Sequence, residues 1–129
     1  MSNEQNQPSQ EENMAWGKGR LSAAVDELSD QGIISSPFVE ARIVWMLPQQ
    51  LFIAELRESS TSPPALWMIG GDDVPADHLD VMLADTPRDA ARHFGLKWHL
   101  AAAREDSSET LVEKAELLLA LVEADEAWT

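Results

Sequence analysis

Cysteine and tyrosine are both absent from this chain of 129 residues. Without cysteine the protein has no disulfide, no thiolate metal site and no cysteine nucleophile. No apolar run approaches the roughly 20 residues that a membrane-spanning helix needs. The first dozen residues are polar and acidic, whereas a secretory signal would be basic and then apolar. We therefore predict a cytoplasmic protein with no membrane partner.

Basic residues are scarce, with nine Lys and Arg against 23 Asp and Glu and a formal net charge of −14. A field of that sign repels nucleic acid and anionic lipid, so direct binding of nucleic acid through a basic surface is not expected. The acids are spread along the chain, which favours solubility as their main role. A surface that mimics nucleic acid and binds a basic protein is the sharper alternative.

The length fits one domain, and we divide it by composition. Residues 1–13 lack a periodic apolar pattern and indicate a disordered acidic tail. Residues 14–104 form the expected α+β core domain. Residues 105–129 form a C-terminal amphipathic helix that packs on the core or on a second subunit.

The amino-terminal half predicts one helix followed by strands. Apolar residues recur at helical spacing over residues 20–31, Gly32 can end that helix, and Gly17 and Gly19 weaken any extension before it. Residues 38–56 are rich in β-branched and aromatic side chains, and the interruption at Pro48 suits a bulge or a sheet edge. Residues 65–70 add a strand that pairs with this region in an antiparallel hairpin.

Two helices with clear start signals close the chain. Thr86 is a capping hydroxyl, Pro87 occupies the first helical position, and the helix extends to about Arg104. Asp106 and Glu109 resemble a second capping box. The fold class is therefore α+β, with an N-terminal helix, an antiparallel sheet of about three strands and two C-terminal helices.

The segment of residues 70–78 contains the main candidate polar site. Asp72, Asp73, Asp77 and His78 follow an apolar strand, where loops often hold functional groups on a rigid scaffold. These groups could bind a divalent cation or act as a general base, but their spacing matches no established metal motif. The structural interpretation is a turn in which aspartates bond neighbouring backbone N–H groups, and we favour it.

The helix that starts at Pro87 adds a narrow basic stripe of Arg88, Arg92 and His99. Arginine binds carboxylates and other anions bidentately, so this stripe could clamp an anion or complete a site with the acidic loop. Neutralisation of the protein's own acids is the favoured alternative. His93 is expected to be partly buried, Trp45, Trp67 and Trp98 are expected in the core, and Trp128 is expected to be exposed or intersubunit.

No strong catalytic signature is present, so we assign no catalytic residue, no metal and no cofactor. The preferred function is a non-enzymatic binding or protein-interaction module, whose partner is itself, as a homodimer, or another protein. The broad apolar face of the last helix favours the homodimer. The alternatives are a small metal-assisted or acid–base hydrolase that uses the Asp72–His78 loop with Arg92 or His99, and an acidic nucleic-acid mimic.

Several short motifs resemble a family of short bacterial proteins known as domain of unknown function 4826. The similarity covers about residues 15–103 and leaves out the terminal helix. It implies a bacterial source and one common fold, and it supplies no activity or catalytic residue. The motifs are Ala15-Trp16, Gly32-Ile33, the strand region of residues 42–56, Gly71-Asp72 with Pro75 and Asp77-His78, and Ala91-Arg92-His93-Phe94 with Leu96-Lys97-Trp98.

Overall fold

A computed structural model describes residues 9–34, 40–59, 61–72, 74–104 and 109–128. Its regular elements, with two short 3-10 helices named η2 and η3, are α1 (Gln10–Asp30), β1 (Glu40–Leu47), β2 (Leu51–Arg57), β3 (Leu66–Gly71), β4 (Asp77–Asp80), η2 (Val81–Leu83), α2 (Pro87–Arg104), α3 (Glu109–Val122) and η3 (Asp125–Trp128). Within the described ranges, no helix has the length and apolar character needed to cross a membrane.

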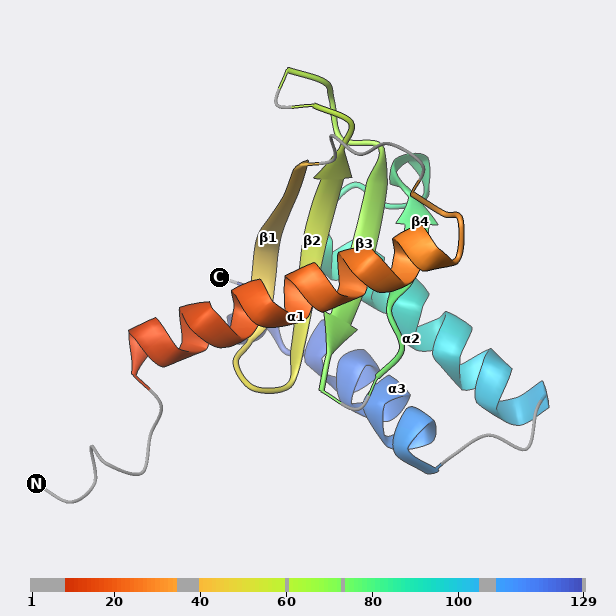
Figure 1. Cartoon of the computed structure of the whole chain (residues 1–129). Coiled ribbons are helices and arrows are strands. Elements are labelled where there is room, and N and C mark those ends of the chain that lie inside the picture. The colour runs from red at the N-terminus through yellow and green to blue at the C-terminus, as the bar shows by residue number, and fades with distance from the viewer. Residues whose placement is uncertain (1–8, 35–39, 60, 73, 105–108, 129) are drawn as a thin grey trace, which may run out of the picture.

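The four strands form one antiparallel sheet in the order β1-β2-β3-β4. Helix α1 crosses one face of this sheet, and α2 and α3 cover the other face (Figure 1). The α+β prediction, with one N-terminal and two C-terminal helices, is confirmed. The fourth strand is β4, a four-residue segment whose sequence had no clear strand pattern.

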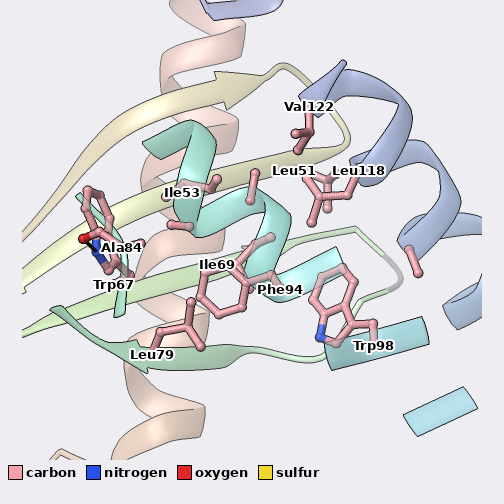
Figure 2. Close-up of a cluster of buried hydrophobic side chains, with 13 residues drawn as sticks. Leu51, Ile53, Trp67, Ile69, Leu79, Ala84, Phe94, Trp98, Leu118 and Val122 are labelled. Atoms are coloured by element: carbon pink, nitrogen blue, oxygen red, sulfur yellow. Dashed lines mark hydrogen bonds between the residues drawn. The ribbon is translucent and has the colours of Figure 1, made fainter. Parts of the chain in front are cut away.

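Side chains along β2 alternate between two apolar clusters, one on each face of the sheet. Leu51 and Ile53 point to the α2 side, whereas Phe52 and Ala54 point to the α1 side. Figure 2 shows the α2-side cluster, in which Phe94 and other side chains of the C-terminal helices meet the strands. The sheet is thus buried on both faces, which explains the continuous apolar runs in β2 and β3.

Strand β1 contains a β-bulge, because its register with β2 shifts between Ile43 and Trp45. Val44 is the extra residue, and it and Trp45 both pack on the α2 side, whereas Met46 packs on the α1 side. The sequence had suggested an irregularity at Pro48. Pro48 instead lies in the turn between β1 and β2, where Gln49 has a φ of 68°.

Helix α1 is longer than the sequence predicted, because it begins at Gln10 rather than near Arg20. Ser9 is its N-cap, and the Ser9 side chain accepts a hydrogen bond from the backbone N–H of Glu12. Residues 10–13, expected in a disordered tail, are therefore helical. Gly17 is buried against β1, where an added Cβ would lie 3.1 Å from both Ile43 and Met46. Close packing explains a glycine that intrinsic propensity alone disfavours.

Helix α3 packs on the core through Ala115, Leu118 and Val122, all of them buried. None of its large apolar residues is among the strongly exposed ones of the described chain. Five of them are partly exposed, namely Leu111, Val112, Leu117, Leu119 and Leu121. Gly95 of α2 makes the contact close, since its missing Cβ leaves room for the Leu119 side chain. The predicted cap at Asp106 lies outside the described residues.

The tryptophans are mostly core residues, as the sequence indicated. Trp67 and Trp98 are buried and Trp45 is partly buried. The expectation for Trp128 was wrong, because its ring stacks on Trp45 with centroids 4.5 Å apart. The Trp45 indole N–H also donates to the carbonyl of Ala127. These contacts attach η3 to β1.

Candidate functional site

The acidic segment that follows β3 begins with a close contact between two backbone segments, at Gly71 and Asp72. Gly71 has a φ of +152°, and an added Cβ there would lie 2.0 Å from the carbonyl oxygen of Gln50. The backbone N–H of Asp72 donates to that same carbonyl at 3.0 Å. The glycine is therefore required by a close approach of two backbones, and it brings Asp72 next to the β1–β2 turn.

Asp72 is bound on the α1 side of the sheet. Its Oδ1 atom accepts a hydrogen bond from Trp16 Nε1 at 3.1 Å and lies 2.7 Å from Arg20 Nε. Both donors belong to α1, one helical turn apart. A second link follows in the same loop, where the backbone N–H of Ala76 donates to Glu27 Oε2 at 2.7 Å. The loop thus holds α1 against the sheet.

Asp77 is bound on the other side, by α2. Its Oδ2 atom accepts a hydrogen bond from Trp98 Nε1 at 3.1 Å, and its Oδ1 atom accepts from Lys97 Nζ at 2.7 Å. Oδ1 also accepts from the backbone N–H of His78. The Asp77 side chain is 17% exposed, and Trp98 is only 2% exposed. This carboxylate therefore connects the first residue of β4 to the middle of α2.

His78 does not form a hydrogen-bonded pair with Asp77. Its Nδ1 atom is 4.0 Å from Asp77 Oδ1, which exceeds hydrogen-bond distance. Its cross-strand partner Met68 belongs to the α1-side cluster, so the imidazole points to that side. Asp73 lies outside the described residues. Among the residues that are described, no group of three or more His, Asp or Glu could hold a metal ion.

The basic stripe on α2 does not pair with Asp72 or Asp77, the aspartates of the acidic loop that the structure describes. Arg88 donates through Nε to the carbonyl of Val122 and through Nη2 to Asp125 Oδ1, both at 2.7 Å. Arg92 Nη1 lies 3.2 Å from Asp89 Oδ1 in its own helix. The expected neutralisation of acids by the stripe is found, but with Asp125 and Asp89 rather than with the loop.

Lys97 is the α2 cation that reaches the loop, and the stripe interpretation missed it. The sequence offered one signal for Lys97. Its neighbour Trp98 was expected in the core, and a residue next to a buried tryptophan lies at the edge of the same interface. His99 is exposed and forms no ion pair with Asp72 or Asp77. His93, expected to be partly buried, is exposed as well. The six predicted site residues that the structure describes therefore do not form one site.

The outer face of α2 has a different composition from the rest of the surface. Leu96 and Leu100, one helical turn apart, are 49% and 58% exposed. We call this surface the α2 outer face, and it consists of the two leucines and the exposed charged or imidazole side chains around them, Arg92, His93, Lys97, His99 and Arg104. The stretch of residues 90–104 contains three Lys or Arg, two His and no Asp or Glu.

Comparison with known proteins gives one result. The family model DUF4826, a domain of unknown function, matches residues 10–128. The match includes α3, so the similarity extends beyond the residues 15–103 that the motifs had suggested. No functionally curated protein and no solved structure matches the chain. This chain therefore belongs to the DUF4826 family.

Proposed function

We propose that this protein is a non-enzymatic interaction module that binds an acidic segment of a partner protein along the α2 outer face. The observation that carries the proposal is the exposed pair Leu96 and Leu100 within a stretch that has no acid. Exposed apolar side chains that are grouped and surrounded by charged ones are typical of protein-binding surfaces. The remaining 114 residues hold six Lys and Arg and all 23 acids, so this face is distinct in charge.

Charge complementarity selects the partner. Arg92 and His99 lie on one side of the leucine pair, and His93, Lys97 and Arg104 lie on the other side. Arg92 and Lys97 already pair with Asp89 and Asp77, so an acidic partner would share or replace these contacts while its apolar side chains cover the leucines. A two-fold dimer through α2 would place these cations against one another, so a second copy is disfavoured here.

The hydrolase alternative lacks support in the site geometry. Asp72 and Asp77 are engaged by different helices on opposite faces of the sheet, and both carboxylates already accept bonds from indole N–H donors. A general base needs an acceptor that a substrate proton can approach. These two carboxylates instead hold α1 and α2 against opposite faces of the sheet.

The binding test uses a defined probe, a blocked acidic peptide that is helical and has leucines one turn apart with glutamates on both flanks. We expect addition of this peptide to shift the backbone amide NMR signals of the α2 outer face. Replacement of both leucines, L96S/L100S, is expected to weaken binding about tenfold or more, because hot-spot side chains dominate such interfaces. Added salt should weaken binding as well.

The matched control is M82S/L83S, which also removes two exposed apolar side chains, 86% and 53% exposed, but from η2. We expect this variant to bind the peptide like the parent. Both variants should unfold within about 0.5 kcal/mol of the parent, since surface substitutions of this kind change stability little. Equal binding by the two variants, or signal changes away from α2, would refute the proposed surface.

A further inference from the structure

A small pocket lies between the bulge of β1, the start of α2 and η3. Its volume is about 290 Å³, and it is lined by Val44, Trp45, Thr86, Pro87, Arg88 and Trp128. We propose that this pocket, which we call the indole pocket, binds a small planar aromatic carboxylate, whose ring lies against the indole rings and whose carboxylate binds Arg88. None of the lining residues belongs to the α2 outer face, so the site is independent of the function proposed above.

Two tryptophan rings line the indole pocket, and both are held in place by contacts within the protein. The rings of Trp45 and Trp128 stack with centroids 4.5 Å apart and an interplanar angle of 20°. The Trp45 indole N–H donates to the carbonyl of Ala127, and the Trp128 indole N–H donates to that of Leu121, both at 2.8 Å. Both rings are therefore ordered before a ligand arrives, which lowers the entropic cost of binding.

The β-bulge of β1 adds to the apolar lining. Regular alternation would direct Val44 and Trp45 to opposite faces of the sheet. The bulge places both side chains on the α2 side, where both line the indole pocket. Bulges are over-represented next to functional sites, where they redirect a side chain. The irregularity of β1 thus gives the pocket two apolar side chains instead of one.

The polar side chains of the indole pocket are hydrogen-bond donors. Thr86 and Arg88 are the polar residues among its described lining, which includes no acid although the chain has 23. A guanidinium has five N–H donors. Arg88 Nε binds the carbonyl of Val122 and Nη2 binds Asp125, whereas Nη1 has no hydrogen-bond partner among the described residues. The Thr86 hydroxyl accepts from the backbone N–H of Asp89 and keeps its own hydrogen to donate. A pocket that offers donors and one cation favours an anionic acceptor such as a carboxylate.

Asp125 is the group that competes with such a ligand for Arg88. Its carboxylate is 85% exposed, lies 2.7 Å from Arg88 Nη2 and is not among the lining residues of the pocket. An exposed ion pair of this kind contributes little, because water and salt screen it. A ligand carboxylate would therefore share the guanidinium with Asp125 or replace it. The bond from Arg88 Nε to the carbonyl of Val122 keeps the guanidinium in position in either case.

The size and shape of the pocket select the rest of the ligand. Pockets for drug-sized ligands have volumes of about 300–1,000 Å³. The indole pocket, at about 290 Å³, lies at the lower limit and fits one ring or two fused rings. A planar aromatic ring can stack on an indole, whereas a saturated ring of the same size cannot. The ligand class is therefore a small aromatic acid.

NMR of the indole N–H groups tests the pocket with a defined probe, 2-naphthoate, which is a planar carboxylate with two fused rings. We expect 2-naphthoate to shift the signals of Trp45 and Trp128 and to leave that of Trp67 unchanged, because Trp67 is buried and does not line the pocket. The neutral 2-naphthamide should bind about tenfold more weakly, since it lacks the charge. The saturated decahydro-2-naphthoate should bind about fivefold more weakly, since it lacks the planar face.

Substitution of Arg88 separates its role in binding from a role in folding. R88Q should weaken binding of 2-naphthoate about tenfold and leave binding of 2-naphthamide unchanged. D125N removes the competing carboxylate and should strengthen binding of 2-naphthoate about twofold. The matched control is R57Q, because Arg57 also donates to a backbone carbonyl and lies beside a carboxylate, but it does not line the pocket. R57Q should bind 2-naphthoate like the parent.

Three results would overturn the proposal. The first is an absence of shifts at Trp45 and Trp128 when 2-naphthoate is added. The second is equal binding of 2-naphthoate and its saturated analogue, which would remove the role of the indole rings. The third is an equal loss of 2-naphthoate and 2-naphthamide binding in R88Q, which would show that Arg88 only supports the local structure.

Discussion

The two described aspartates of the β3–β4 segment, five positions apart, end in different environments on opposite faces of the sheet. Asp77 is 17% exposed and accepts a hydrogen bond from Trp98, itself 2% exposed. Asp72 is 34% exposed and binds Trp16 and Arg20 at the surface of α1. Removal of a carboxylate destabilises a protein most where it leaves a buried hydrogen-bond donor without an acceptor. Both aspartates bind a helix to the sheet, but the loss of Asp77 should lower the free energy of unfolding more than the loss of Asp72.

All five tryptophans donate hydrogen bonds through their indole N–H groups. Trp45, Trp67 and Trp128 donate to backbone carbonyls, whereas Trp16 and Trp98 donate to Asp72 and Asp77. The two aspartates therefore belong to a common pattern in this protein, in which a large aromatic ring packs between elements and its polar edge is satisfied. This pattern accounts for acids that the sequence alone presents as a possible active site.

Replacement of Asp77 by alanine should lower the free energy of unfolding more than any other substitution proposed for these two aspartates. The Trp98 indole N–H would remain buried without an acceptor, and Lys97 would lose its partner. We expect a loss of about 2–3 kcal/mol in the free energy of unfolding, measured by urea denaturation. Asp77→Asn keeps an oxygen that can face Trp98 and should cost less. An Asp77→Ala variant as stable as the parent would refute the fastening role of this carboxylate.

Replacement of Asp72 by alanine should have a smaller effect, about 1 kcal/mol in the same measurement. Its donors are more exposed, so water can replace the lost acceptor, and a surface ion pair such as that with Arg20 contributes little. Asp26→Ala is the matched control, since this exposed aspartate of α1 has no ion pair with other described residues, and it should change stability by less than about 0.5 kcal/mol. A larger loss for Asp72→Ala than for Asp77→Ala would reverse the comparison.

Local patterns were sufficient to predict much of the fold. The Thr86 cap and Pro87 located the start of α2, and the Thr86 side chain does accept a hydrogen bond from the backbone N–H of Asp89. The apolar runs predicted the central strands. The start of α1 was missed although Ser9 and Glu12 form a local capping signal, because Gly17 and Gly19 weighed against a helix there, and the packing of Gly17 on β1 is a tertiary contact. The bulge at Val44 was missed because no local pattern marks it.

The candidate site was predicted by residue type but not by arrangement. Both aspartates were expected to bond neighbouring backbone N–H groups, and Asp77 does so with His78, whereas the carboxylate of Asp72 binds Trp16 and Arg20 of α1. Sequence spacing cannot reveal such partners, because Trp16 is 56 positions from Asp72 and Lys97 is 20 positions from Asp77. Helical geometry placed Arg92 and His99 on one stripe correctly, but it could not orient that stripe relative to the loop.

The indole N–H signals of the tryptophans provide the most direct test of the claim that Asp72 and Asp77 fasten two helices independently. The chemical shift and hydrogen-exchange rate of each indole would be measured by NMR in the parent, in Asp72→Ala and in Asp77→Ala. We predict that Asp77→Ala changes the Trp98 indole and leaves Trp16 unaffected, that Asp72→Ala does the reverse, and that Trp67 stays constant in both. Unchanged Trp16 and Trp98 signals in folded variants would contradict this account.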